Sequence, residues 1–373
     1  MRKKILLIGN VGFTITNFRS ELIEDFLKNG FDVVVVCKQD FYTDQFKGLN
    51  IVYYNIPLKR HGVNPFFEIK TFNALRKIIK KEKPDIVINY TIKPNIYGSI
   101  AAKINHVPVI CSNITGLGFV FTGKNLKRKI FRQIIKPFYY LALKTNKLVF
   151  FENKDDGILF EKLHLVDPKK IVFINGAGVN TDRFFPQGIE KEEASFILVS
   201  RLLWDKGIRE YVEASRILKQ KYNHAKFYIL GPFDENPSAI PKHIIESWEK
   251  EGIISYLGST TDVRPFLAKS MVSVLPSYRE GTPKAILEAM AMGLAVVTTD
   301  VPGCRDTVTP GVTGYLVEAE NSYSLSQAME KFILNPALAN EMGLNGIELI
   351  KQKFDIHTVN RTIYDNVSGA TIQ

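Results

Sequence analysis

Short runs of β-branched residues, each followed by a helical pattern, recur along both halves of this chain. Residues 33–36 are four consecutive valines, and residues 86–88 read Ile-Val-Ile. A strand that is apolar at every position is buried on both faces, which is typical of a parallel sheet with helices on both sides. The alternation of strands and helices therefore predicts a doubly wound α/β fold.

The alternation occurs twice and breaks between residues 176 and 194. In the first half we expect strands at residues 4–8, 32–37, 51–54, 85–89 and 107–112, and helices at residues 17–29, 65–81 and 94–104. In the second half we expect strands at residues 196–200, 225–230, 253–257, 272–275 and 295–298, and helices at residues 207–219, 241–251 and 283–292. A chain of 373 residues has room for two domains. We predict Rossmann-like domains over residues 1–180 and 181–355, facing a central cleft. Residues 356–373 are expected to form a helix that packs back on the first domain.

Positive charge is concentrated in the first half. Residues 1–175 contain 29 Lys and Arg against 14 Asp and Glu, whereas the remainder contains 20 against 24. Between Asp85 and Glu152 there are ten basic residues and no acidic one. This distribution predicts an anionic partner for the first domain: a membrane surface, a lipid phosphate or a nucleic acid.

Other classes of protein are poorly supported. The three cysteines are far apart, without a Cys-x-x-Cys motif or a histidine cluster, so we expect neither disulfides nor a zinc site. The compartment that we expect is a reducing cytoplasm. No apolar run is long enough to span a membrane, and the apolar start is too short for a signal peptide. No Gly-x-Ser-x-Gly motif indicates a serine hydrolase.

Residues 277–293 carry the strongest chemical signal. Glu280 and Glu288 lie eight positions apart, with Thr282 and Pro283 between them as a predicted helix N-cap and first-turn proline. We therefore expect Glu280 on a loop and Glu288 inside the helix. The amides of residues 283–285 would favour an anion such as phosphate at the helix N-terminus. One carboxylate is placed to bind a ribose diol and the other a sugar.

Two cations precede this segment. Arg201 follows the first strand of the second domain, and Lys206 lies at the start of the next helix. We expect both to point toward the Glu280 loop, where a guanidinium and an ammonium would neutralise a diphosphate. There is no Asp-x-Asp motif for a divalent metal, so we expect no metal site and stabilisation of a departing nucleotide diphosphate by protein cations.

The first domain offers weaker signals at its strand ends. Residues 9–12 are predicted to form a turn whose small residues, Gly12 included, let a sugar or phosphate approach the backbone. They lack the full Gly-x-Gly-x-x-Gly pattern and the following acidic residue, which argues against a nicotinamide enzyme. The candidate contacts for an acceptor phosphate or sugar are Arg60, Lys93, Asn95, Thr115 and Gly116.

The basic tract 123–141 interleaves cations with large apolar residues at helical spacing. It fits an amphipathic helix on anionic lipid, and a helix packed on the sheet with a solvated cationic face is the alternative. The candidate membrane contacts are Lys127, Arg128, Phe131, Arg132 and Ile135. Nucleic acid is not expected as a partner, because no known binding module accompanies the charge.

Taken together, Arg201-x4-Lys206 and Glu280-x7-Glu288 within Glu-Gly-Thr-Pro-x-x-x-Leu-Glu-Ala resemble the retaining glycosyltransferases of family 4. The resemblance extends over nearly the whole chain and implies a GT-B fold. It also implies that Arg201 and Lys206 hold the diphosphate, Glu288 the ribose and Glu280 the donor sugar, with residues 258–263 facing the base. The donor contacts expected in this way are Gly12, Arg201, Lys206, Gly258, Val263, Glu280, Gly281, Thr282, Pro283, Lys284, Ala285 and Glu288, of which Glu280, Arg201 and Lys206 are the catalytic candidates.

Three further segments, 93–98, 113–118 and 230–237, look like those of polyprenyl-diphosphate-linked amino-sugar transferases of bacterial glycan and capsule assembly. Some members of the family have a histidine after the fifth strand, where this chain has residues 112–115, Ser-Asn-Ile-Thr, so no protein base is assigned. The resemblance implies a retaining, metal-independent transfer of an N-acetylhexosamine from a UDP-sugar to a polyprenyl-diphosphate-linked saccharide. The enzyme would be peripheral on the inner face of the cytoplasmic membrane and would need no cofactor. The alternatives are a UDP-N-acetylglucosamine 2-epimerase, which needs no acceptor, and a nucleic-acid-binding protein with a vestigial nucleotide site.

Overall fold

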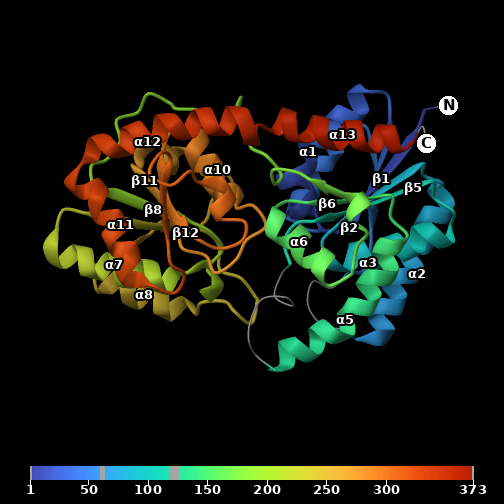
Figure 1. Ribbon diagram of the computed structural model, residues 1–373, viewed down its shortest axis with the longest axis horizontal. Helices are drawn as coiled ribbons and strands as arrows, with labels where there is room; N and C mark the ends of the chain where they lie inside the picture. Colours follow the sequence, from blue (N-terminus) through green and yellow to red (C-terminus); the bar gives the residue numbers. More distant parts are fainter. Residues whose placement is uncertain (1, 59–63, 118–125, 372–373) are drawn as a thin grey trace. The chain divides into compact units, whose positions relative to one another are not determined.

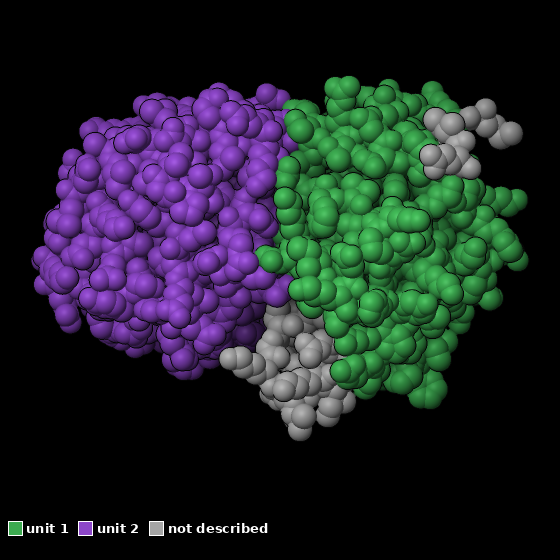
Figure 2. All heavy atoms as spheres, viewed as in Figure 1, with its two compact units in different colours: residues 1–177, 356–373 green, residues 178–355 purple. Residues whose placement is uncertain are grey.

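The computed structural model describes residues 2–58, 64–117 and 126–371, and only the backbone of residues 126–132. The chain divides into two compact units (Figure 2), one of residues 1–177 with 356–373 and the other of residues 178–355. Each unit has its own sheet, and every strand pair described is parallel. The prediction of two doubly wound α/β domains is confirmed.

The first unit is built on a seven-stranded sheet with the order β3-β2-β1-β4-β5-β6-β7 (Figure 1). Its strands are β1 (Lys4–Val11), β2 (Asp32–Lys38), β3 (Ile51–Asn55), β4 (Ile86–Tyr90), β5 (Val109–Ile114), β6 (Leu148–Phe151) and β7 (Ile171–Phe173). Its helices are α1 (Gly12–Lys28), α2 (Pro65–Glu82), α3 (Ile92–Ile104), α5 (Leu126–Lys144), α6 (Lys154–Lys162) and α13 (Ile356–Ala370), with short 3-10 helices η1 (Phe41–Gly48) and η2 (Pro168–Lys170).

Alternate residues of the central strands enter two different cores, as expected for strands that are apolar throughout. Ile5 and Leu7 of β1 pack with residues of α1 and α13, whereas Leu6 and Ile8 pack on the opposite face with residues of α2 and α3. The last helix, α13, places Val359 in the first of these cores. The sheet is therefore buried between two helical layers.

The first strand runs directly into the first helix, so the turn predicted at residues 9–12 is wrong, and the helix begins well before residue 17. A Cβ at Gly12 would lie 2.2 Å from Oδ1 of Asp40. The other oxygen of that carboxylate accepts a hydrogen bond from the backbone N of Phe13, at 2.8 Å. Asp40, on the loop after β2, thus caps the N-terminus of α1. The space beside Gly12, where a Cβ would lie, is therefore occupied by the carboxylate of Asp40.

The second unit is built on a six-stranded sheet with the order β10-β9-β8-β11-β12-β13. Its strands are β8 (Ser195–Val199), β9 (Lys226–Leu230), β10 (Ser255–Tyr256), β11 (Val272–Leu275), β12 (Ala295–Thr299) and β13 (Gly314–Val317). Its helices are α7 (Ile208–Lys221), α8 (Lys242–Lys250), α9 (Arg264–Lys269), α10 (Lys284–Ala291), α11 (Ser322–Leu334) and α12 (Pro336–Leu349), with η3 (Trp204–Lys206), η4 (Arg305–Thr307) and the π-helix η5 (Ile350–Phe354). Phe196 and Ile197, neighbours on β8, enter separate cores on the two faces of the sheet.

Candidate functional site

The loop between β11 and α10 carries the predicted site at the carboxyl edge of the second sheet. Lys206, at the end of η3, donates a hydrogen bond from Nζ to Oε1 of Glu280. Ser277 Oγ donates to the same carboxylate oxygen, at 2.8 Å. The side chains of Lys206 and Glu280 are only 18% and 14% exposed. The structure therefore brings two of the three catalytic candidates together, with Ser277 as a third partner that the sequence did not reveal.

Two glycines let neighbouring loops close on the Glu280 loop. Gly207 has φ 71°, and a Cβ there would lie 2.0 Å from the carbonyl oxygen of Pro276. Gly303 has φ 83°, and a Cβ there would lie 2.2 Å from the carbonyl oxygen of Gly281. Only glycine combines this backbone conformation with so close an approach. The loop is therefore fixed from both sides, and the carboxylate of Glu280 is held in position.

The N-terminus of α10 differs from the prediction in one respect. The helix begins at Lys284 and its N-cap is Pro283, without a side-chain cap hydrogen bond, so Thr282 is not the N-cap. Pro283 has no N–H group, which leaves the amides of Lys284 and Ala285 as the first donors of the helix. Gly281 and Thr282 lie partly exposed on the loop before it. The N-terminus of α10 still favours an anion, because its first backbone amides and the helix dipole present positive charge there.

Glu288 lies one turn further along α10 and is largely buried. Its Oε1 is 3.8 Å from Nζ of Lys284, and its side chain is 12% exposed. Burial raises the pKa of Glu288 above its usual range, while the positive charges of Lys284 and Arg183 oppose the rise and Asp262 adds to it. A buried carboxylate of this kind is suited to accept hydrogen bonds from a diol.

Arg201 follows β8 as predicted, and it forms an ion pair with a residue of the segment 230–237. Its Nη1 lies 2.6 Å from Oδ2 of Asp234, on the loop after β9. The orientation of Arg201 toward the Glu280 loop stays a prediction. Nothing in the sequence linked Asp234 to Arg201, since it is 33 positions away and only the sheet order makes β8 and β9 neighbours.

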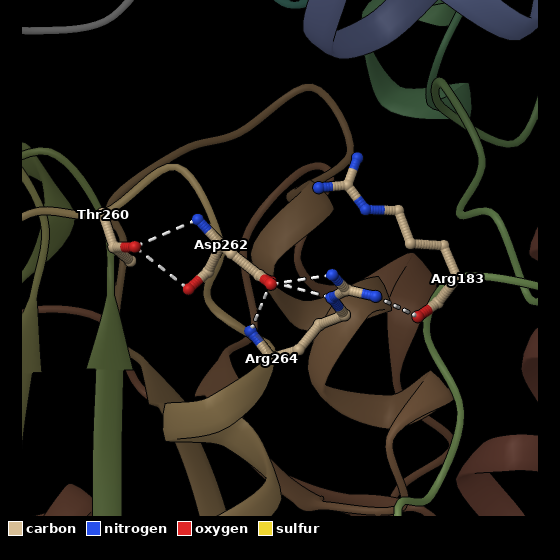
Figure 3. Close-up of polar contacts among 4 residues, drawn as sticks. All are labelled: Arg183, Thr260, Asp262 and Arg264. Carbon is tan, nitrogen blue, oxygen red and sulfur yellow. Dashed lines mark hydrogen bonds and ion pairs between the residues drawn. The ribbon is translucent and has the colours of Figure 1, made fainter.

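The loop expected to face the base, residues 258–263, is closed by a compact set of polar contacts (Figure 3). Nε and Nη2 of Arg264 donate to the two carboxylate oxygens of Asp262, at 2.8 and 2.7 Å. Thr260 Oγ1 accepts from the backbone N of Asp262, at 3.0 Å. The carbonyl oxygen of Arg183 accepts a hydrogen bond from Nη1 of Arg264, at 3.5 Å, and no contact joins the guanidinium of Arg183 to the other residues drawn. Gly258 has φ 76°, and Val263 packs on the apolar core.

The predicted acceptor contacts have mixed positions in the first unit. Lys93 Nζ is paired with Glu68 of α2, at 2.6 Å and largely buried, so its charge is already neutralised. Asn95 is buried, and its Nδ2 donates to the carbonyl oxygen of Asn113, at 3.0 Å. Thr115 and Gly116 are partly exposed on the loop after β5. Arg60 lies outside the described residues.

The part of the basic tract that the structure describes forms the predicted helix, α5. Ile135 packs against the core, whereas Ile134, Phe138 and Leu141 are each about half exposed. These three residues recur at helical spacing and share one face. The side chains of Lys127, Arg128, Phe131 and Arg132 lie outside the described residues. The structure thus corrects the membrane assignment of Ile135.

A group of buried polar atoms in the first unit was not anticipated. At the carboxyl edge of the sheet, Oδ1 and Nδ2 of Asn113, Oγ1 of Thr91 and Oδ1 of Asn10 have no hydrogen-bond partner among the described residues. Nearby, Arg19 Nη2 forms a buried ion pair with Glu152 Oε1, at 2.8 Å. Burial raises the pKa of Glu152, and Arg19 opposes the rise. Unsatisfied buried groups cost about 1–3 kcal/mol each, so they are rare without a reason.

Within residues 2–58, 64–117 and 126–371, no group of three or more His, Cys, Asp or Glu side chains could hold a metal ion. None of the helices described there is both long and apolar enough to cross a membrane.

Two family descriptions match the chain. Residues 179–349 match Glycosyl transferases group 1, and residues 4–153 match Glycosyl transferase 4-like. The chain therefore belongs to the group 1 and 4-like glycosyltransferases, and it is an enzyme. The GT-B prediction is confirmed by its two parallel-sheet Rossmann-like units and by solved glycosyltransferase structures of the same fold.

Individual relatives narrow the comparison. The chain is 29% identical to the N,N'-diacetylbacillosaminyl-diphospho-undecaprenol alpha-1,3-N-acetylgalactosaminyltransferase of Campylobacter jejuni, over 92% of this chain and 93% of that one. It is 27% identical to the UDP-Gal:alpha-D-GlcNAc-diphosphoundecaprenol alpha-1,3-galactosyltransferase of Escherichia coli, over 87% and 86%. The crystal structure of the Anabaena protein HepE in complex with UDP and glucose superposes with a TM-score of 0.79 at 17% identity, covering 99% of this chain and 100% of that one. The last comparison shows the fold alone.

Proposed function

We propose that this glycosyltransferase moves an N-acetylhexosamine from a UDP-sugar to a saccharide linked to polyprenyl diphosphate, with retention of configuration and without a metal ion. The observation that carries the proposal is the grouping of Lys206, Glu280 and Ser277 beside the N-terminus of α10. A cation and a helix N-terminus favour the diphosphate, and the fixed carboxylate accepts hydrogen bonds from a sugar. The names of the two bacterial relatives support the lipid-linked acceptor.

In the proposed reaction, the bond between the sugar C1 and the UDP oxygen breaks, and a bond from C1 to the acceptor oxygen forms on the same face. The acceptor hydroxyl loses its proton to the departing diphosphate, so UDP leaves with the electron pair and that proton. Lys206, Arg201 and the amides of Lys284 and Ala285 stabilise the negative charge that develops on the diphosphate. Glu288 binds the ribose, and Glu280 orients the donor sugar. Gly12 remains a predicted donor contact in the first unit.

We further propose that the first unit docks on the inner face of the cytoplasmic membrane. Ile134, Phe138 and Leu141 of α5 present an apolar face in the part of the chain that carries most of the positive charge. Such a combination favours an anionic bilayer. All three cysteines are free and buried, which fits a reducing compartment.

The test is release of UDP by the purified protein with UDP-N-acetylglucosamine, UDP-N-acetylgalactosamine, UDP-glucose or GDP-mannose. Each donor is supplied with and without an undecaprenyl-diphosphate-linked saccharide, and with and without EDTA. We expect release that requires the lipid-linked saccharide and persists in EDTA. Lys242→Ala, at a largely exposed lysine of α8, serves as the matched control for Lys206→Ala.

Two results would contradict the proposal. Loss of activity in EDTA, restored by Mg²⁺, would overturn metal independence. Conversion of UDP-N-acetylglucosamine to its C2 epimer without acceptor would favour the epimerase instead.

A further inference from the structure

The carboxyl edge of the first sheet holds a set of polar side chains whose hydrogen bonds are unmade. Both polar atoms of the Asn113 side chain are buried without a partner among the described residues, and the residue is 1% exposed. Oγ1 of Thr91 and Oδ1 of Asn10 are likewise buried and unpartnered within the described chain. An asparagine inside a parallel sheet would ordinarily have its amide satisfied, so these atoms suit a molecule that is not part of the chain.

These residues lie on three adjacent strands. Tyr90, the last residue of β4, pairs with Asn113 of β5, and Thr91 follows directly. Asn10 lies near the end of β1, which pairs with β4. The strand order reverses between β1 and β4, and in open α/β sheets ligands bind where this reversal occurs. Asn10 and Thr91 are only partly buried, so they lie nearer the surface than Asn113.

Thr91 adds an independent sign. It occupies the N-cap position of α3, where threonine ordinarily accepts a hydrogen bond from the helix, yet its side chain makes no cap hydrogen bond. Its φ of 74° is unusual for a β-branched residue. Strained backbone of this kind is concentrated at ligand sites. The hydroxyl is thus held away from the helix that it would otherwise cap.

The charges around this edge are already paired. Arg19 forms its buried ion pair with Glu152, and its guanidinium lies 4.6 Å from the ring centre of Tyr90. Lys93 is paired with Glu68. The groups of Asn10, Thr91 and Asn113 that have no partner among the described residues are neutral amides and a hydroxyl. Such groups both donate and accept hydrogen bonds, which matches sugar hydroxyl and acetamido groups better than phosphate.

We propose that Asn10, Thr91 and Asn113 form a subsite that reads the hydroxyl or acetamido groups of a saccharide ring. The inference rests on the proposed function, because it supplies that enzyme with sugar contacts in its first unit. The ring belongs either to the acceptor or to the donor, and both present the same chemistry. An internal water that satisfies Asn113 is the competing explanation.

The main variant is Asn113→Leu, which keeps a similar volume and removes both polar atoms. Thr91→Val keeps the β-branched shape and removes the hydroxyl. Asn29→Leu, at an exposed position after α1 in the same unit, is the matched control. The measurements are kcat/KM for the lipid-linked acceptor, the KM for the UDP-sugar, the Kd for UDP and the Tm.

We expect Asn113→Leu to lower kcat/KM by about 10- to 100-fold, because sugar groups lose their hydrogen-bond partners. Thr91→Val should cause a smaller loss in the same direction. The Kd for UDP should not change, and any fall in Tm should be no larger than the small cost of the added bulk of leucine, since Asn113 makes no side-chain hydrogen bond to the described residues in the free protein. If the KM for the UDP-sugar also rises, the ring is the donor's; if only the KM for the lipid-linked saccharide rises, the ring is the acceptor's.

A wild-type kcat/KM in Asn113→Leu would overturn the subsite. So would a fall in Tm together with weaker UDP binding, because that result indicates a structural water. A second measurement does not depend on transfer. It follows the NMR resonance of the Asn113 side-chain NH2 group in protein labelled with ¹⁵N-asparagine; this resonance is assigned by its absence from the spectrum of Asn113→Leu. The resonance should shift on titration with methyl N-acetylhexosaminides. A wild-type protein without any transferase activity would refute the proposed function, and this titration would then decide the subsite alone.

Discussion

Replacing Lys206 by methionine separates its contact with the substrate from its role as the counter-ion of Glu280. The variant keeps the aliphatic side chain and leaves Glu280 with the hydrogen bond from Ser277. Loss of one partner from a fully buried pair costs about 3–5 kcal/mol. Because both side chains retain some exposure, we expect about 2 kcal/mol here, which lowers the Tm by roughly 4–8 °C.

The same variant should weaken binding of UDP. A charge-assisted hydrogen bond contributes about 1.5–3 kcal/mol, so loss of the ammonium should raise the Kd for UDP by about 10- to 100-fold. If Lys206 also stabilises the departing diphosphate, kcat should fall by about 10²–10³-fold. Isothermal titration with UDP measures the first effect, and UDP release with the full set of substrates measures the second.

Glu280→Gln and the double variant complete the cycle. Glu280→Gln alone should leave the Kd for UDP near that of wild type, since Glu280 is assigned to the sugar. The double variant should recover most of the lost Tm, because no buried charge is left unpaired, but UDP should still bind as weakly as in the single Lys206 variant. Recovery of wild-type UDP affinity in the double variant would refute the diphosphate role and leave Lys206 as a counter-ion.

Three further predictions follow from the second unit. Arg201→Ala should lower kcat by about 10²-fold or more, whereas Asp234→Asn, which removes only the charge that positions the guanidinium, should cause a smaller loss in the same kinetic assay; equal losses would contradict a positioning role for Asp234. Burial raises the pKa of Glu288, so the protonated acid is favoured in the folded protein: the stability that this group contributes is present at low pH and is lost as the pH rises through the raised pKa. Glu288→Gln should therefore be at least as stable as wild type at neutral pH by thermal unfolding. In wild type, the KM for the donor should rise as the pH falls, because Glu288 becomes protonated, and Glu288→Gln should abolish this rise. A pH-independent KM in wild type would contradict the assignment of Glu288 to the ribose. Gly303→Ala should destabilise the fold and reduce activity more than Gly311→Ala, because both glycines have positive φ but only a Cβ at residue 303 meets the Glu280 loop; equal effects in thermal unfolding would show that the close approach is unimportant.

The order of strands and helices was predictable because burial on both faces leaves a local record in the sequence. Runs such as the four valines of β2 are apolar at every position, and β2 was placed to within one residue. The start of α1 was not predictable in this way. Its cap is supplied by Asp40, which lies 27 positions from the amide it binds, so no spacing near residue 12 reports it.

In the candidate site, too, features with a local sequence pattern were predictable and long-range contacts were not. The positions of Glu280, Glu288 and Lys206 could be predicted because each lies near a strand end or a helix start that the local pattern marks. The pairing of Asp234 with Arg201 was missed because it depends on the neighbouring positions of β8 and β9. On α5, periodicity identified an amphipathic helix but not its rotation about its axis, and the difference of one residue between Ile134 and Ile135 decides which is exposed.

The position of α13 has a consequence for synthesis of the protein. The first unit takes part of its core from Val359, Ile363 and Val367, which follow the whole of the second unit in the chain. During translation, the second unit can therefore leave the ribosome with its core complete while the first unit still lacks a helix. The earlier half of the chain finishes folding later than the half that follows it, against the usual N-to-C-terminal order of domain folding. Until then, the apolar surface that α13 covers is open to chaperones.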